Sequence, residues 1–138
     1  MLTKIFAVTA FALLTSSSAL AAAGGCHTIA GTHTNRTVPC VVPAVGCVES
    51  QVTGDLEGTS LTVITHFDPV AQIYSGTWTS FLTNGAVVEG TIVGWVGSVI
   101  TFTGGTRQFA HATGTLVTVP PTSEGPGTHA GEYCLGNG

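Results

Sequence analysis

The chain has 138 residues, of which 43% are hydrophobic, only 7% are charged and 19 are glycine. Three basic residues are too few to neutralise a nucleic-acid backbone, and a coiled coil would need many more charged positions. The composition also argues against a disordered chain, because this much hydrophobic sequence with so little charge can bury a core. The length suits one domain.

The N-terminus has the pattern of a secretory signal peptide over residues 1–23. Lys4 is the only lysine, an apolar run fills residues 5–14, and small residues lead to a cleavage site after Ala21 or Ala23. The alternative, a membrane anchor, is disfavoured because the apolar run is shorter than the ~20 residues that span a bilayer. We therefore expect a secreted or periplasmic protein, with no integral membrane association after cleavage.

Removal of residues 1–23 would leave two arginines against seven acidic residues, which disfavours nucleic acid and anionic membranes as partners. Four cysteines remain, an even number that predicts two disulfides in an exported protein. Three pairings are open, and of these we expect Cys40–Cys47 and Cys26–Cys134. The alternatives are a zinc site, disfavoured by the absence of a C-x-x-C pair, and a lipid on Cys26, disfavoured by a poor lipobox.

Most of the mature chain is expected to form β-strands, because threonine and valine dominate and no helical periodicity is sustained. Residues 24–47 lack alternation and are expected to form an irregular N-terminal arm held by cysteines, with the β domain at 48–138. The predicted strands are residues 48–56, 60–67, 72–83, 86–96, 99–103, 115–119 and 129–135.

Short turns join most of these strands. Asn84-Gly85 predicts a type I′ hairpin turn, and Gly97-Ser98 a second two-residue turn. An antiparallel meander with apolar residues on both faces must close or stack. We therefore expect an all-β fold, a small antiparallel up-and-down β-barrel, with a β-sandwich as the alternative.

One segment, residues 104–114, resembles the GGTGxFxxAxG signature of the allene oxide cyclase-like and dirigent-like β-barrels. The matching residues are Gly104, Gly105, Thr106, Phe109, Ala112 and Gly114. Residues 52–59 are similar to the opening strand of that family, and the resemblance extends over about residues 48–135. Arg107 departs from the pattern at a position where the family usually has glycine, and His111 at one where bacterial members often do.

The resemblance implies a barrel with an apolar cavity. Family activities include cyclisation of an unstable epoxide and steering of radical coupling, but no acid–base residue of those enzymes has a match here. The paired glycines suit a turn with positive φ, and Phe109 and Ala112 are expected to plug one barrel end. The motif thus bears on fold more than on activity.

Two residues are weak candidates for catalysis. Glu89 lies in the middle of a predicted strand; facing inward it would be a carboxylate in an apolar cavity, but the glycine-rich opposite face suits the interior better, so we expect Glu89 in solvent. His66 is expected to share a face with Thr62 and Ile64, two residues before Asp68, and could transfer protons. Asp68 before a proline is otherwise explained as a turn cap.

Other chemistry has little support. The five histidines show no compact ligand spacing, so no metal or cofactor is expected. Tyr74, Trp78 and Trp95 could line a ligand cavity, although aromatic residues in strands often serve only packing.

The sequence therefore favours an exported, disulfide-stabilised binding or structural module for a small apolar ligand, without catalysis. A cyclase or isomerase with an apolar cavity is one alternative. A cell-surface interaction protein is another, and a homo-oligomer is also compatible with the sequence.

Overall fold

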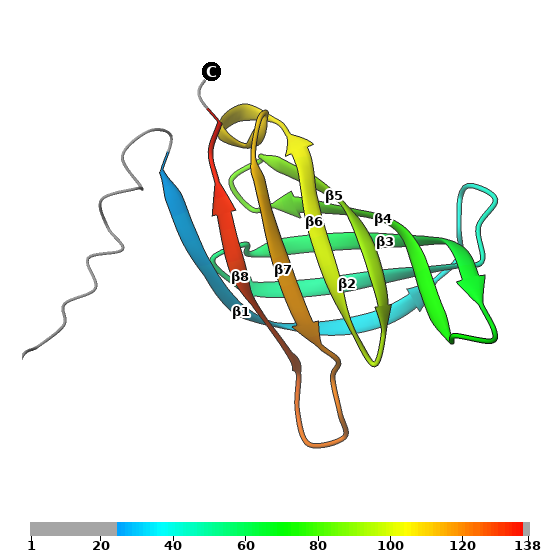
Figure 1. Ribbon diagram of the computed structural model, residues 1–138. Coiled ribbons are helices and arrows are strands. Elements are labelled where there is room, and N and C mark those ends of the chain that lie inside the picture. The colour runs from blue at the N-terminus through cyan, green and yellow to red at the C-terminus, as the bar shows by residue number, and fades with distance from the viewer. Residues whose placement is uncertain (1–24, 137–138) are drawn as a thin grey trace, which may run out of the picture.

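Eight antiparallel strands form a closed barrel in the computed structural model, which describes residues 25–136 (Figure 1). The strands are β1 (Cys26–Val38), β2 (Gly46–Gly54), β3 (Gly58–Asp68), β4 (Ile73–Leu82), β5 (Val87–Trp95), β6 (Gly97–Gly105), β7 (Thr113–Val119) and β8 (Gly127–Cys134). A single 3₁₀ turn, η2 (Arg107–Phe109), lies between β6 and β7. The predicted up-and-down barrel is confirmed, and the sandwich alternative is wrong.

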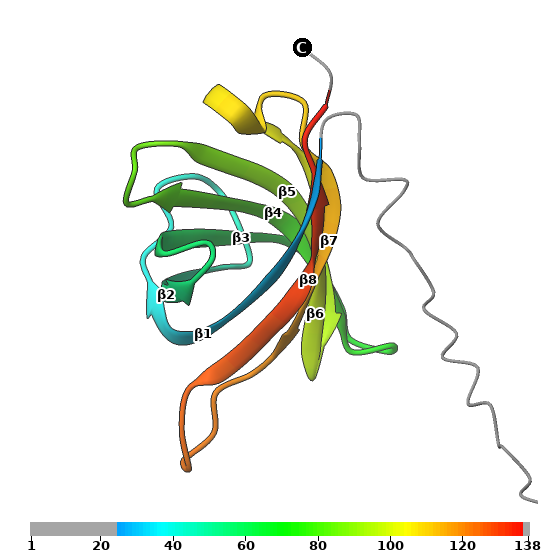
Figure 2. The ribbon, with the colours of Figure 1, turned by 90° about the vertical axis from the view of Figure 1, so that its left-hand side faces the viewer.

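Each strand pairs with its neighbours in sequence, and β1 pairs with β8 to close the barrel (Figures 1 and 2). Strand β5 shows why these residues form such a sheet. Val88, Gly90 and Ile92 are buried inside, whereas Glu89 and Thr91 are exposed outside. Alternation of this kind gives each strand one face for the interior and one for water.

The prediction of an irregular arm over residues 24–47 is wrong for most of that segment. Residues 26–38 form the longest strand, β1, which pairs with β2 and with β8, so the barrel domain begins at Cys26. Alternation was hidden because Ile29 is followed on the inward face of β1 by Gly31 and His33 rather than by further aliphatic residues. The predicted signal peptide, residues 1–23, lies outside the described residues.

The hairpin at Asn84-Gly85 is present, but the turn type differs from the prediction. Gly85 has φ +87°, whereas Asn84 does not have a positive φ, as type I′ would require. The Gly85 N–H donates to the Leu82 carbonyl, and the Leu82 N–H donates to the Ala86 carbonyl. Three residues therefore form the loop, a turn completed by a left-handed glycine. The β5–β6 turn likewise has its tip at Val96, before the predicted Gly97-Ser98.

The two barrel ends differ. At one end η2 and the β2–β3 and β4–β5 loops cover the interior, and Leu56, Ala86, Phe109 and Ala112 are almost fully buried there. Phe109 and Ala112 thus lie where the plug was expected. At the other end, formed by the β1–β2, β3–β4, β5–β6 and β7–β8 connections, no such plug exists among residues 25–136. We call these the plugged end and the open end.

Both predicted disulfides are formed. Cys26–Cys134 joins β1 to β8 at the seam that closes the barrel, where the two residues are direct cross-strand partners. Cys40–Cys47 closes the β1–β2 loop at the open end. The four cysteines are therefore all oxidised. No helix within residues 25–136 is long and apolar enough to cross a membrane.

Candidate functional site: the barrel cavity

A cavity of about 210 Å³ occupies the barrel interior between the plug and the open end. A single water needs only about 10–15 Å³ of such space, so the cavity has room for a small organic molecule. Inward side chains from all eight strands line it. No aspartate, glutamate, lysine or arginine is among them. An uncharged interior of this kind suits a ligand without net charge, because an unpaired ion would lose its hydration.

One side of the cavity is apolar and aromatic. Trp78 of β4 is buried and stacks on Phe102 of β6, with ring centroids 5.8 Å apart and planes 11° from parallel. Ile92, Ile100 and Leu116 continue this wall across β5, β6 and β7. Such a surface can bury the apolar part of a ligand, and each Å² of apolar area removed from water stabilises the complex by about 25 cal/mol.

The other side of the cavity is a polar arc, formed by three side-chain pairs that each join neighbouring strands. Ser98 and Thr118 lie 2.7 Å apart between their hydroxyl oxygens on β6 and β7. The Ser50 hydroxyl donates to Asn35 Oδ1 at 2.8 Å between β2 and β1. Between these two pairs, His33 of β1 and His129 of β8 face each other. The cavity is therefore amphipathic.

The histidine pair is the least expected feature of the cavity. The Nδ1 atoms of His33 and His129 are 3.5 Å apart, and the side chains are 8% and 4% exposed. Burial lowers the pKa of both imidazoles, and at His129 the proximity of His33 lowers it further while the Asp55 carboxylate partly opposes that change. Both rings are therefore neutral at pH 7, and each nitrogen can donate or accept according to its tautomer.

Glycine on the facing strand makes room for each imidazole. His129 pairs across the sheet with Gly31, and His33 pairs with Gly127. A Cβ built on Gly31 would lie 2.5 Å from His129 Nε2, and one built on Gly127 would lie 2.5 Å from His33 Nε2. The two rings thus occupy space that any other residue on the opposite strand would fill.

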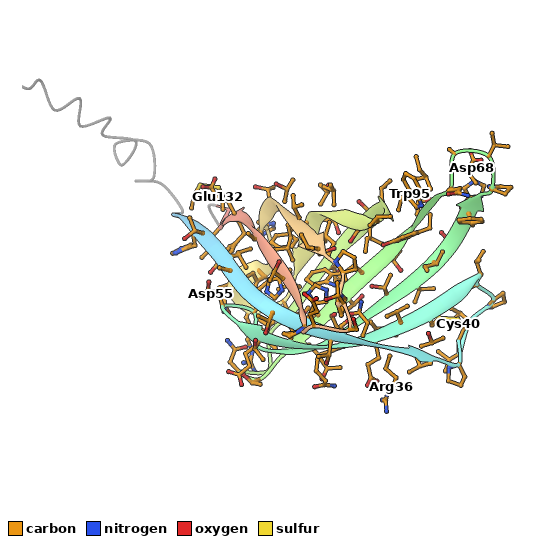
Figure 3. The ribbon with its side chains drawn as sticks, turned by 90° about the horizontal axis from the view of Figure 1, so that it is seen from below. Arg36, Cys40, Asp55, Asp68, Trp95 and Glu132 are labelled. Carbon is orange, nitrogen blue, oxygen red and sulfur yellow. A yellow bond between two sulfur atoms is a disulfide. The ribbon has the colours of Figure 1, made fainter. Side chains whose placement is uncertain are left out.

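The three aromatic candidates all line the cavity. Trp78 lies deep within it. Tyr74 is half-buried nearer the open end. Trp95, labelled in Figure 3, is 64% exposed at the end of β5, on the open side of the barrel and opposite the end that carries Asp55 and Glu132. Trp95 therefore lies where the cavity meets the open end of the barrel.

The two catalytic candidates lie elsewhere. Glu89 is exposed on the outer face of β5. His66 was expected to lie on the same face of its strand as Thr62 and Ile64, and this is wrong. A β-bulge between Ile64 and His66 inserts one residue, so that His66 pairs with the outward Ser75 and becomes exposed. A one-residue insertion moves every later side chain to the other face.

The neighbour of His66 serves the turn. The Asp68 carboxylate accepts hydrogen bonds from the Ala71 and Val70 N–H groups at 3.0 and 2.9 Å, which lowers its pKa. Asp68 therefore caps the β3–β4 turn, as its position before a proline indicates.

The glycine motif runs from the end of β6 to the start of β7, at the plugged end. Gly104, Gly105 and Gly114 all have positive φ, and a Cβ on Gly105 would meet the Val87 carbonyl oxygen at 2.1 Å. Arg107 adopts φ +54°, the left-handed conformation that glycine favours, and its guanidinium donates to the Asn84 carbonyl. Thr106 accepts a hydrogen bond from the Val87 N–H through its hydroxyl. The motif residues therefore shape the plug and lie away from the cavity lining.

Within residues 25–136, one group of three metal-ligand residues converges: Cys26, Glu132 and Cys134. Its two cysteines form a disulfide, so they have no thiolate to offer an ion. No protein-family model and no curated protein matches this chain.

Sequence reasoning missed the histidine pair because its members are 96 residues apart. A weak signal was present. In β1, Ile29, Gly31 and His33 alternate with Ala30 and Thr32, which is the alternation of a strand with glycine and histidine on its inner face.

Proposed function

We propose that this protein is an exported binding module that holds a small uncharged molecule inside its barrel, without catalysing a reaction. The observation that carries the proposal is the cavity itself. Its lining is part apolar and part polar, includes no aspartate, glutamate, lysine or arginine, and faces the open end of the barrel. A few placed polar groups on a mostly apolar lining are the usual composition of a small-molecule site. The polar arc refines the expected ligand, which should combine an apolar flat face with at least one hydrogen-bonding group.

Export is part of this proposal. Two disulfides persist in oxidising compartments, and the N-terminal sequence has the pattern of a secretory signal. The likeness to allene oxide cyclase-like and dirigent-like barrels also belongs to the proposal. It is supported by the barrel topology and by the glycine conformations of residues 104–114, while Arg107 departs from the pattern.

The enzyme alternative has less support. It needed Glu89 or His66 inside the cavity, and both are exposed on the outside of the barrel. A binding role requires no such group and uses the cavity as it is.

The experiment is a titration of the mature, disulfide-intact protein with indole, a neutral flat molecule with one N–H donor, followed by ¹H–¹⁵N NMR. We expect saturable shifts of amides in the cavity wall, including Ser50, Ser60 and Ser98. Thr118→Trp would fill the cavity near its mouth and should abolish these shifts.

Thr115→Trp provides the matched control. It places the same side chain on the outer face of the same strand, and should leave indole binding unchanged. Absence of saturable shifts in the wild-type protein, or equal shifts in Thr118→Trp, would overturn the proposed binding function.

A further inference from the structure

We propose that the open end of the barrel docks on the surface of a zwitterionic phospholipid bilayer. The inference goes beyond the proposed function, because this end would bind lipid whether or not the cavity holds a ligand. The contact surface consists of exposed apolar side chains at three connections of the open end. We call it the apolar rim, and its members are Val41, Val42, Val45, Val70, Trp95 and Val96.

The rim side chains protrude from the tips of their loops. Val41 is 94% exposed on the β1–β2 loop, Val70 is 93% exposed on the β3–β4 turn, and Val96 is 76% exposed at the tip of the β5–β6 turn. One exposed valine is ordinary on a protein surface, whereas large apolar side chains gathered at one end indicate an interaction.

The three connections share one end of the molecule. In Figure 3, Cys40, Asp68 and Trp95 mark them and lie on the side opposite Asp55 and Glu132. Trp95 also lines the cavity, so the rim borders the opening of the cavity. Docking through the rim would therefore turn this opening toward the lipid.

The loops at the plugged end have the opposite character. They bury their large apolar residues, Leu56 and Phe109, and expose charged ones such as Glu57 and Arg107. Every large apolar side chain that is exposed on a loop within residues 25–136 lies at the open end. Apolar exposure in the loops thus has a direction, which a surface-bound protein requires and a freely tumbling one does not.

The charges beside the rim indicate which partner fits it. The connections at the open end contain no lysine or arginine, and their acidic residues are Asp68 at the end of β3 and Glu124 in the β7–β8 loop. Hydrogen bonds from the Ala71 and Val70 N–H groups hold the pKa of Asp68 below its usual range, so it is ionised. These carboxylates complement the ammonium groups of zwitterionic headgroups. They would be repelled by anionic lipids, and by the same carboxylates of a second copy docked rim to rim.

The form of the rim also suits a bilayer. Its side chains stand on separate loops around an opening, and fluid lipid can surround each of them, as it does the apolar face of an interfacial helix. Trp95 is suited to the headgroup level, where tryptophan is enriched because its ring is apolar and its N–H can remain hydrated.

The test is co-sedimentation of the mature, disulfide-intact protein with phosphatidylcholine vesicles. We expect the wild-type protein to bind, and Val41→Asp/Val70→Asp to bind at least tenfold more weakly, because two charges would have to enter the apolar boundary. Both valines are more than nine-tenths exposed, so their replacement should leave the fold intact. The control Gln108→Asp/His111→Asp adds two acidic groups at the plugged end and should bind within about twofold of wild type.

Three results would overturn the proposal. The first is no binding of the wild-type protein at millimolar lipid, or equal binding by all three proteins. The second is binding only to vesicles of anionic phosphatidylglycerol. The third is rim-dependent dimers in sedimentation velocity without binding to vesicles, which would assign the rim to a second copy. The indole titration contains no lipid, so the two proposals fail separately.

A second measurement locates the contact in the wild-type protein. Brominated phosphatidylcholine quenches tryptophan fluorescence at short range, and it should quench Trp95 while Trp78, buried inside the barrel, continues to emit. Trp95→Phe should remove the quenched part of the emission. Quenching that persists unchanged in Trp95→Phe would contradict docking through the rim.

Discussion

The imidazole of His129 lies over Gly31 on the neighbouring strand, with Nε2 only 2.5 Å from where a Cβ on that glycine would be. His33 has the same relationship with Gly127. Two glycines, one on each strand of the closing seam, therefore give the buried histidine pair its room. The seam that closes the barrel therefore also carries the central pair of the polar arc.

The first prediction concerns these glycines. Gly31→Ala would place a Cβ 2.0 Å from the Thr53 carbonyl oxygen as well as against His129. Because backbone cannot move aside cheaply, we expect a loss of about 2–3 kcal/mol in the free energy of unfolding, measured by chemical denaturation. Gly125→Ala is the control, since a Cβ there meets nothing within 4 Å, and it should change stability by less than about 0.5 kcal/mol. Equal stability of the two variants would contradict this packing.

The second prediction concerns pH. Burial lowers the pKa of His33 and His129 in the folded protein, so the unfolded chain binds more protons once the pH falls below about 6.5. The free energy of unfolding is therefore largest above that pH. It declines as the pH falls toward the lowered pKa values that the two histidines have in the folded protein. Thermal unfolding between pH 7 and pH 5 should show the decline in the wild-type protein and in His66→Asn.

The double variant His33→Asn/His129→Asn supplies the comparison, and its unfolding temperature should vary much less between pH 7 and pH 5.

Asp68 contributes to stability in a separate, more acidic pH range. Its pKa is lowered by hydrogen bonds from Ala71 and Val70, so its contribution is present above about pH 4 and is lost below it. If the unfolding temperature of the double histidine variant falls between pH 7 and pH 5 by as much as that of the wild-type protein, groups other than His33 and His129 cause the decline.

The third prediction ranks the disulfides. Cys26–Cys134 closes a loop with a sequence separation of 108, and Cys40–Cys47 one of 7. The loop-entropy relation gives about 4.8 kcal/mol for the long loop and about 2.5 kcal/mol for the short one. Cys26→Ser/Cys134→Ser should therefore destabilise the barrel more than Cys40→Ser/Cys47→Ser, as measured by denaturant midpoints. The reverse order would mean that the seam holds without its disulfide.

The fourth prediction concerns Arg107, which adopts the left-handed φ of +54° where the resembling family usually has glycine. Such a conformation costs an L-residue about 1–2 kcal/mol, and a β-branched side chain tolerates it least. We expect Arg107→Val to destabilise the barrel by about 1 kcal/mol or more. In Arg107→Gly, relief of strain should offset the lost contact with Asn84, giving a change within about 0.5 kcal/mol. Similar losses in both variants would indicate that the guanidinium contact dominates.

Much of the barrel could be predicted because strands β2 to β8 alternate visibly and are separated by short connections, several of which contain glycine or proline. The turn at Asn84-Gly85 shows the limit of such reasoning, since the dipeptide marks a hairpin without fixing which residue takes the positive φ. Strand β1 was missed because its inward positions hold Gly31, His33 and Asn35, which do not look like a core face until the barrel supplies a polar cavity.

The candidate site was predicted less well. Tyr74, Trp78 and Trp95 line the cavity, which leaves their role in ligand binding a prediction. His66 was assigned to the wrong face, because no residue near Thr65 indicates a β-bulge in the sequence. The histidine pair depends on the closure of β1 onto β8, a contact between the two ends of the chain that no local pattern reports.

The central claim, that the barrel interior is a ligand site, is tested most directly by a crystal structure of the mature protein grown with indole. We expect indole between Trp78 and the histidine pair, with its ring against the aromatic wall and its N–H on an acceptor of the polar arc. Indole found only on the outer surface, with side chains closing the interior, would contradict the account.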